Sequence, residues 1–320
     1  FPMYMTSLSS EMASEAALVH IRTASGLALK NALVAREARR AQDYADRWTA
    51  LSAEARDQVK SKVLMTLSSS EPRAGTVAAQ VTAAIAAIEL PRGMWPDLVS
   101  QLLAAIGDLH NPCQRQAALQ AIGFTCEVVD PAVLAAQSNE ILTAVIQGAR
   151  KEETSPEVQL AALRALLNSL EFVRLNFERE GERNFIMQVV CEATQSPHVA
   201  VKVAAFENLV RIMQLYYDKM RFYMEQALFG LTVLGMRDPE PHVALQAVEF
   251  WSTVCDEEIE LSLEAAEALE FNEEPAHVSY HFAQIALPEI APVLMELLAL
   301  QDEDTDEDEW DTSKAVSYTH

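Results

Sequence analysis

The residues of this chain that could carry out chemistry begin with its four cysteines. Cys113, Cys126, Cys191 and Cys255 lie 13, 65 and 64 residues apart, so no pair has the CxxC spacing of a zinc or dithiol site. Thiols dispersed in this way through a long chain are typical of reduced core residues in a cytosolic or nuclear protein. We therefore expect free cysteines in the core.

The histidines offer one further candidate, because His277 and His281 have the i, i+4 spacing that places two side chains on one face of a helix. Two such histidines could ligate a metal ion, but no third ligand accompanies them at the spacing of a known metal site. The simpler interpretation is the start of a helix with exposed or capping histidines.

A run of carboxylates from Asp302 to Glu309, DEDTDEDE, has the alternating acids of a calcium-binding loop. An EF-hand loop needs glycine at its sixth position and glutamate at its twelfth, whereas Glu307 and Ser313 stand there. The P-loop, GxGxxG, GxSxG and HExxH motifs are missing from the sequence as well. The sequence therefore predicts no enzyme, no metal and no cofactor, which leaves binding as the function.

The charge of the chain indicates which partners to expect. Its 320 residues include 24 Lys and Arg against 47 Asp and Glu, a formal net charge of −23. Such an acidic chain is repelled by phosphate groups, so we expect no nucleic-acid and no anionic-membrane partner. The acidic run, which self-repulsion favours as a loop, lies next to Trp310 and suits a basic peptide through long-range attraction and cation–π contact.

Two further features concern the context of the chain. The most apolar stretch, Ala74 to Ile88, is too short to span a bilayer, and the N-terminus lacks the basic and apolar regions of a signal peptide. The sequence begins with Phe1 rather than Met, from which we expect a fragment.

The elements that must position any site are helices, because apolar residues recur at spacings of three and four and alternation is hard to find. Four helices are predicted to begin with a capping residue followed by proline. Their starts are 44, 41 and 42 residues apart: Asn111-Pro112, Ser155-Pro156, Ser196-Pro197 and Asp238-Pro239. A partner helix precedes each of them, over residues 95–106, 139–149, 183–193 and 223–236.

Alanines recur at the same period within these helices, at Ala118, Ala162, Ala205 and Ala244. Weaker copies of the pattern occur at residues 24–33 and 83–90. A period of about 40–47 residues with two helices per unit is typical of HEAT or armadillo repeats. We predict an all-α fold, an α-solenoid superhelix of antiparallel HEAT helix pairs. One continuous domain over residues 1–320 would hold six pairs and an incomplete seventh from near Phe282, with the acidic loop 302–309 in the last repeat.

Several long segments resemble the importin-β family, the karyopherin-β nuclear import receptors that partner importin-α. The resemblance is carried by SNEILTAVIQGARKEE (138–153), ALLNSLEFVRLNFEREGERNFIMQVVCEATQSP (165–197), ALQAVEFWSTVCDEE (244–258) and QDEDTDEDEW (301–310). It extends to ASGLALKNAL (24–33), DRWTAL (46–51) and WPDLVSQLL (95–103). It covers nearly the whole chain and implies a piece from about the second to the eighth HEAT repeat.

The resemblance implies a receptor that shuttles between cytoplasm and nucleus, binds FG-repeat nucleoporins weakly at the nuclear pore and releases cargo when RanGTP binds. The family's FG pocket lies between the first helices of neighbouring repeats. Its lining matches Leu142, Thr143, Ile146, Glu182, Phe185 and Ile186. A second slot would use Phe185, Ile186, Tyr223 and Leu231, the last in place of an isoleucine.

The resemblance also implies a surface for RanGTP and basic partners. Its residues here are Lys30, Glu249, Asp256, Asp302, Glu303, Asp304, Asp306, Glu307, Asp308, Glu309 and Trp310. Without the first repeat we expect weakened RanGTP binding, and without the repeats beyond the acidic loop we expect loss of tight binding to the basic segment of importin-α. The alternatives are a HEAT scaffold of another kind and an acidic chaperone for basic proteins.

Overall fold

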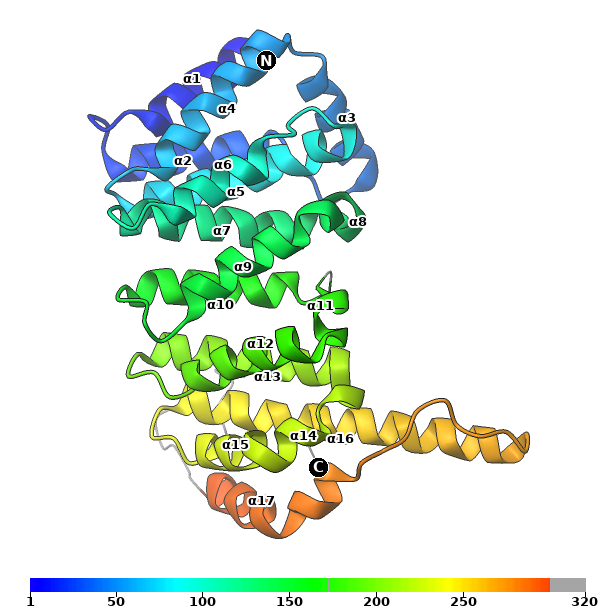
Figure 1. The fold of residues 1–320 in the computed structure, drawn as a ribbon. Helices are drawn as coiled ribbons and strands as arrows, with labels where there is room; N and C mark the ends of the chain where they lie inside the picture. The colour runs from blue at the N-terminus through cyan, green and yellow to red at the C-terminus, as the bar shows by residue number, and fades with distance from the viewer. Residues whose placement is uncertain (172, 300–320) are drawn as a thin grey trace. The chain divides into compact units, whose positions relative to one another are not determined.

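A computed structural model describes residues 1–171 and 173–299, and in them every regular element is helical (Figure 1). The chain divides into two compact units, Phe1–Asn176 and Phe177–His320, with the division inside the short helix α11 (Arg174–Glu178). The predicted all-α class is confirmed. Each unit is described by itself.

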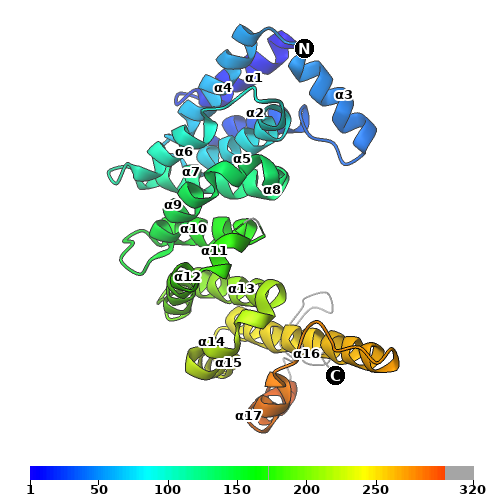
Figure 2. The same cartoon turned by 45° about the vertical axis from the view of Figure 1, so that its right-hand side comes forward.

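The first unit consists of helix pairs. Its helices are α1 (Pro2–Ala13), α2 (Val19–Asn31), α3 (Ala38–Thr49), α4 (Ala53–Leu67), α5 (Pro72–Glu89), α6 (Leu98–Gly107), α7 (Pro112–Val128), α8 (Pro131–Leu134), α9 (Ser138–Ala149) and α10 (Pro156–Ser169). Helix α1 packs on α2, α4 on α5, α6 on α7, and α9 on α10. The second helices of the pairs stack in the order α2, α5, α7, α10, which gives this unit two helical layers (Figure 2).

The second unit repeats the arrangement. Its helices are α12 (Glu180–Ala193), α13 (Val199–Tyr216), α14 (Arg221–Tyr223), α15 (Phe229–Met236), α16 (Pro241–Glu270) and α17 (Phe282–Ala299). Helix α12 pairs with α13 and α15 with α16, the second helices α13 and α16 are in contact, and α17 packs on α15 and α16. Five π-helical residues, Met224–Leu228, join α14 to α15.

Small residues make the close contact between layers possible. The recurring alanines Ala118, Ala162, Ala205 and Ala244 are all buried, with at most 2% of their surface exposed. Methyl side chains at these places let neighbouring helix backbones approach, and the larger Leu119, Leu163 and Phe206 beside them fill the remaining space.

Two of the four predicted helix starts are confirmed. The side chain of Asn111 accepts a hydrogen bond from the Gln114 amide at 3.0 Å, and that of Ser155 accepts from the Val158 amide at 3.3 Å. In both helices proline follows the capping residue, where its missing N–H costs no hydrogen bond.

The other two predicted starts are wrong by two residues each, since α13 begins at Val199 rather than Pro197 and α16 at Pro241 rather than Pro239. Ser196 and Asp238 each accept a hydrogen bond from the amide two residues later, which makes a turn before the helix rather than a cap on it. The partner helix expected from residue 95 likewise begins later, at Leu98. The one expected from residue 223 begins at Arg221 and includes the π turn.

The longest apolar helix also exceeds the expectation from the sequence. With a following 3₁₀ turn, α5 continues from Pro72 to Arg92, which is long and apolar enough to cross a membrane, as is α17. Most of α5 is buried, packed on α2, α4 and α7, so its apolar composition is that of a core helix. Helix α17 is mostly exposed and contains Pro288 and Pro292.

Partly buried ion pairs tie the second helix of one repeat to the loop of the next. The Arg115 guanidinium in α7 donates to Glu153 at 2.6 Å and to the carbonyl oxygen of Ile106 at 3.1 Å, and Lys202 in α13 donates to Asp238. Burial alone would raise the pKa of Glu153, but the hydrogen bonds from Arg115 and the Ser155 amide outweigh it and hold that pKa below its ordinary value of 4.5.

We therefore expect an acid-sensitive contribution to stability from Glu153. A carboxylate with a depressed pKa stabilises the fold above its ordinary pKa, and this contribution is lost as the pH falls below about 4.5 through the lower folded value. Urea unfolding measured from pH 7 downward should show a smaller acid-induced loss of stability in Glu153→Gln than in the wild type. An identical pH dependence in the two proteins would contradict the assignment.

Candidate functional site

The first predicted slot begins on α9, where Leu142, Thr143 and Ile146 lie one turn apart. Thr143 is exposed, and its hydroxyl donates to the Asn139 carbonyl oxygen at 2.7 Å. Leu142 and Ile146 are 6% and 2% exposed. These residues belong to the first unit, whereas the other predicted lining residues, Glu182, Phe185 and Ile186, lie on α12 in the second. The assembled first slot therefore stays a prediction.

The second predicted slot lies entirely within the second unit. On α12, Phe185 exposes 46% of its surface while Ile186 is buried, and on α15 Leu231 is partly exposed. The Tyr223 hydroxyl accepts from Arg183 Nε at 3.2 Å and donates to Asn184, so the structure brings the first helices of these two repeats together.

Beside this slot lies Phe222, an exposed aromatic residue that the sequence analysis missed. It exposes 60% of its surface, and its ring meets that of Tyr223 edge-on with centroids 5.4 Å apart. The Phe-Tyr pair at the start of a first helix was the signal that could have identified it.

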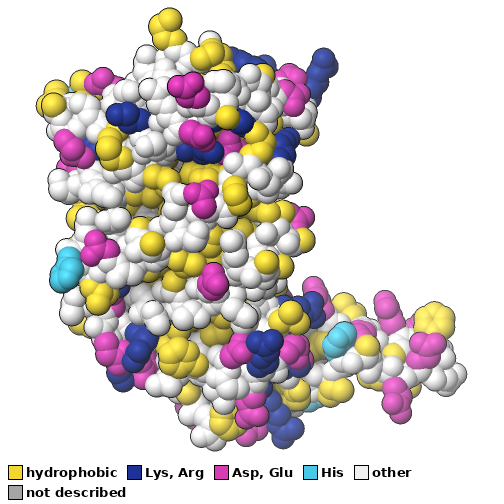
Figure 3. All heavy atoms as spheres, turned by 45° about the horizontal axis from the view of Figure 1, so that its top comes forward, with side chains coloured by type: hydrophobic (Ala, Val, Ile, Leu, Met, Phe, Trp, Pro, Cys, Tyr) yellow, Lys and Arg dark blue, Asp and Glu magenta, His cyan; other side chains and the backbone are white. Residues whose placement is uncertain are grey.

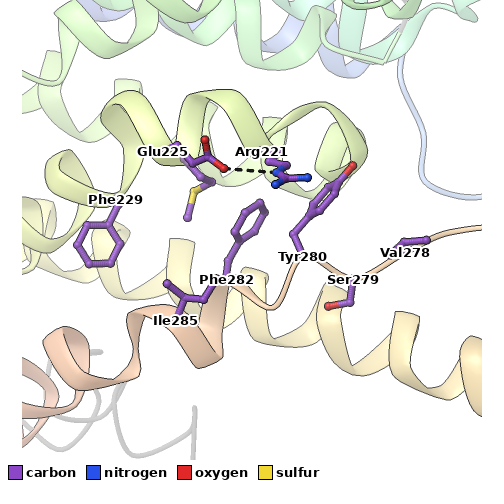
Figure 4. A pocket seen from close by; sticks show the side chains of 9 residues that line it. Arg221, Glu225, Phe229, Val278, Ser279, Tyr280, Phe282 and Ile285 are labelled. Atoms are coloured by element: carbon purple, nitrogen blue, oxygen red, sulfur yellow. Dashed lines mark hydrogen bonds and ion pairs between the residues drawn. The ribbon is translucent and has the colours of Figure 1, made fainter.

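An apolar hollow of the second unit, here called the α15–α17 pocket, lies one repeat further along. Its volume is about 580 Å³. The lining is mostly apolar and aromatic: Arg221, Met224, Glu225, Phe229, Val278, Ser279, Tyr280, Phe282 and Ile285. In Figure 4 the side chains of Phe229, Phe282 and Ile285 converge on it, and the Arg221–Glu225 pair, at 3.3 Å, lies at its rim. The pocket lies between α15 and α17, the first helices of two neighbouring repeats. The family resemblance implies the same kind of location for the two predicted slots.

The π turn helps to shape this pocket. In an α-helix, residues five apart point in different directions, whereas the i to i+5 hydrogen bonds of a π-helix bring them onto one face. Met224, the first residue of the π turn, and Phe229, which directly follows it, both line the pocket. No residue pattern in the sequence announces a π turn, which explains why the sequence analysis placed no site here.

A hollow between α4 and α6 in the first unit has the opposite character. Its volume is about 480 Å³, and polar side chains make up most of its lining: Asp57, Lys60, Ser61, Leu64, Met94, Trp95, Asp97 and Gln101. The space between first helices of neighbouring repeats is therefore polar in one place and apolar in another, so the apolar lining of the α15–α17 pocket is specific to that pocket.

Comparison with known proteins identifies the chain. Residues 1–69 match the family model of the importin-beta N-terminal domain. Importin subunit beta-1 of Schizosaccharomyces pombe is 56% identical over 317 residues, which cover 99% of this chain and 37% of that protein. A crystal structure of importin beta from an ammonium sulfate condition superimposes with a TM-score of 0.94 at 48% identity, covering all of this chain and 37% of the other. The chain belongs to the importin-β family.

The importin-β structure confirms the predicted solenoid of HEAT helix pairs, and the chain spans about 37% of the length of these relatives. Two structures of yeast Kap95p are also similar. One concerns Kap95p and the switch loops of RanGDP (TM-score 0.88, 42% identity, 99% and 37% covered), and the other is a Kap95:Nup1 complex (TM-score 0.84, 43% identity, 99% and 37% covered).

The residues that the importin-β resemblance assigns to Ran and basic partners are only partly described. Glu249 and Asp256 are exposed on α16 and, being seven residues apart, share one helix face. Lys30 is half-buried on α2 and donates to Gln80 Oε1 at 3.0 Å. The acidic loop 302–309 and Trp310 lie outside the described residues.

The outer half of α16 is the most acidic part of this importin-β chain that the structure describes. It extends past α13 and α15 in the ribbon, and in Figure 3 its surface shows carboxylates interspersed with hydrophobic side chains. Burial and then the charges of Glu260 and Asp256 raise the pKa of Glu257. From Asp256 to its end at Glu270 the helix has seven acids and neither Lys nor Arg, so this half of the helix repels anions.

The histidine pair is not a helix-face pair in the structure, because residues 277–281 are not helical. His277 instead lies 3.1 Å from a carboxylate oxygen of Glu264, and His281, with a φ of 57°, directly precedes α17. The four cysteines are free, as expected, but only Cys126 is fully buried, and burial raises the pKa of its thiol to about 12.

Proposed function

We propose that this chain is part of a nuclear transport receptor that shuttles between cytoplasm and nucleus and binds FG-repeat nucleoporins. The observation that carries the proposal is the apolar and aromatic α15–α17 pocket between first helices in the second unit. The family resemblance predicts a further slot one repeat earlier, at Phe185, Ile186, Tyr223 and Leu231. The Kap95:Nup1 complex, formed by a similar protein, supports the same class of partner.

The size and lining of the pocket suit a phenylalanine side chain. Phe229, Phe282 and Ile285 offer an apolar cavity in which a ring can contact other rings edge-on or offset. Burying one phenylalanine is worth roughly 1.5–3 kcal/mol, which by itself corresponds to binding weaker than about millimolar. Several such sites in a row give useful affinity through multivalency while each contact exchanges rapidly.

As the family resemblance implies, we also propose Leu142, Thr143, Ile146, Glu182, Phe185 and Ile186 as nucleoporin-binding residues. Phe185 is shared by this predicted slot and by the one with Tyr223 and Leu231. It is also the most exposed of these apolar residues, so its replacement tests both slots without placing a charge in the core.

The test is a titration of an FxFG-repeat peptide followed by residue-resolved NMR. In the wild type we expect weak, saturable shifts at Ile285 and around Phe185. Ile285 is 68% exposed and lines the pocket, so Ile285→Asp should abolish the shifts at the pocket and leave those near Phe185. Phe185→Ala should abolish the shifts near Phe185 and leave those at the pocket. Leu287→Asp, at a 56% exposed position of the same helix outside the pocket lining, is the matched control and should bind as the wild type does.

The absence of saturable shifts in the wild type would refute nucleoporin binding by this chain. Equal loss of binding in Ile285→Asp and Leu287→Asp would show that charge on α17, rather than the pocket, decides affinity.

We propose that the exposed acids Glu249 and Asp256, with Lys30 and the acidic run through Trp310, contribute to contacts with RanGTP and with the basic segment of importin-α. The support is the acidic face of α16 and the Kap95p structure that concerns RanGDP.

An acidic chaperone for basic proteins is the second candidate, favoured by the same carboxylates. Binding of a lysine-rich peptide that falls steeply with salt and ignores Ile285→Asp and Phe185→Ala would support the chaperone.

A further inference from the structure

One buried acid of α16 has no part in the acidic surface described above. Glu258 is 8% exposed, and both of its carboxylate oxygens accept hydrogen bonds. Its Oε1 accepts from the Tyr217 hydroxyl at 2.7 Å and from the Phe282 amide, and its Oε2 accepts from the Ala283 amide at 3.1 Å. The carboxylate thus caps the N-terminus of α17 from another helix, where negative charge is favourable.

The same network holds Tyr280, two residues before the start of α17. The Tyr217 hydroxyl, which donates to Glu258, accepts from the Tyr280 amide at 2.9 Å, and the Tyr280 hydroxyl donates to the Asp218 carbonyl oxygen at 3.2 Å. The rings of Tyr217, Tyr280 and Phe282 lie together with centroids 5.4–5.6 Å apart.

Tyr280 and Phe282 are also one wall of the α15–α17 pocket, as Figure 4 shows. This wall is a short non-helical segment and the first turn of α17, and between its two rings His281 adopts a left-handed φ of 57°. A backbone in that region is unfavourable for a residue with a Cβ and persists where surrounding contacts fix it. Glu258 supplies two of those contacts directly and one through Tyr217.

We propose that Glu258 is a positioning residue of the α15–α17 pocket: its buried carboxylate fixes Tyr280 and Phe282 in the arrangement that accepts a partner's aromatic ring. The proposal rests on the proposed function for its ligand, and on the hydrogen bonds above for its mechanism. Glu258 is not among the residues that line the pocket, so it acts on the ligand only through Tyr280 and Phe282.

The chemistry of the carboxylate is specific. A glutamine of the same shape keeps one acceptor oxygen, but its NH₂ group would meet the Ala283 amide, which is also a donor. Glu258→Gln should therefore release the start of α17 while it preserves the volume of the side chain. Glu260→Gln, an exposed change of equal charge two residues away, is the matched control.

Two measurements on the whole chain test the proposal. The first is amide hydrogen exchange, in which Glu258→Gln should accelerate exchange at Tyr280, Phe282 and Ala283 and leave α12 and α13 unchanged. The second is the FxFG-peptide titration. There Glu258→Gln should weaken binding at Ile285 by about tenfold or more, the effect of one lost charge-assisted hydrogen bond, and leave binding near Phe185 unchanged. Glu260→Gln should alter neither.

Faster exchange with unchanged affinity at Ile285 would overturn the proposal, as would unchanged exchange. Equal weakening at Ile285 and Phe185 would also overturn it, because that result indicates general destabilisation. If the wild type binds no peptide, the proposed function fails, and the exchange pattern alone then decides whether Glu258 fixes the wall. Tyr217→Phe, which keeps the ring and removes only the bridging hydroxyl, should show the same effects more weakly and serves where Glu258→Gln does not fold.

Discussion

Replacing Glu89 with alanine is expected to lower the free energy of unfolding by about 3–5 kcal/mol, because it leaves buried cations without their counter-charge. Glu89 lies at the end of α5 with none of its surface exposed. Its Oε1 accepts from the Trp48 indole N–H at 3.0 Å, its Oε2 accepts from Lys60 Nζ at 3.0 Å, and the Arg56 guanidinium lies 3.6 Å away.

The Lys60 side chain, a partner of Glu89, has little exposed surface through which water could replace the lost carboxylate. The Lys60 side chain is 11% exposed and its ammonium group lies 5.1 Å from the centre of the Trp95 ring. Burial alone would lower the pKa of Lys60, but Asp57 and Glu89 raise it above its ordinary value, so the lysine is charged in the fold. Without Glu89, Lys60 loses one of the two carboxylates that raise its pKa, and only Asp57 remains.

Urea unfolding followed by circular dichroism measures this loss, with Glu127→Ala as the control because Glu127 is exposed at the end of α7. The control should change stability by less than about 0.5 kcal/mol. Adding Lys60→Met to Glu89→Ala should restore part of the loss, since it removes a buried charge that has lost one of its two carboxylate partners. Strictly additive losses in the double variant would contradict the explanation.

Phe206→Ala is expected to cost about 3–5 kcal/mol in the second unit, the usual range for removal of a buried phenylalanine ring. Phe206 is 2% exposed on α13, and its ring occupies the space above Gly235 of α15. A Cβ added at Gly235 would lie 2.6 Å from Phe206 Cζ and 3.1 Å from the Ala247 Cβ, closer than carbon atoms pack.

A double-mutant cycle makes this prediction specific. Gly235→Ala alone should cost about 1–3 kcal/mol through overpacking. In the Phe206→Ala background most of that cost should disappear, because the ring that clashes is gone and the added methyl group fills part of the cavity. If urea unfolding shows an equal cost of Gly235→Ala in both backgrounds, the Phe206 ring is not the reason that position 235 requires glycine.

The contrast between the predicted helix starts shows how far local sequence reasoning reaches. At Asn111 and Ser155 the capping side chain and the proline both belong to the first helical turn. At Ser196 and Asp238 the same dipeptides form a turn before the helix. Both outcomes satisfy the backbone amides locally, so the packing of the following helix decides between them.

For the candidate sites, family resemblance supplied the residues of two slots, and the predicted residues of one of them, Phe185, Ile186, Tyr223 and Leu231, belong to a single unit. The α15–α17 pocket was beyond prediction, because its lining comes from a π turn, a non-helical segment and the start of α17. Residues 221–229 and 278–285 meet only in the fold, and no local pattern encodes that meeting.

The sequence by itself determined the all-helical class, the repeat period and the acidic character, since each follows from local periodicity or from counting charges. Only the tertiary structure decided which buried charges are paired and which apolar residues remain open to a partner. Glu258 and Glu257 are neighbours of identical type, yet only Glu258 turns inward to cap α17. That difference depends on the direction of each side chain relative to helices far away in the chain, which a linear pattern does not contain.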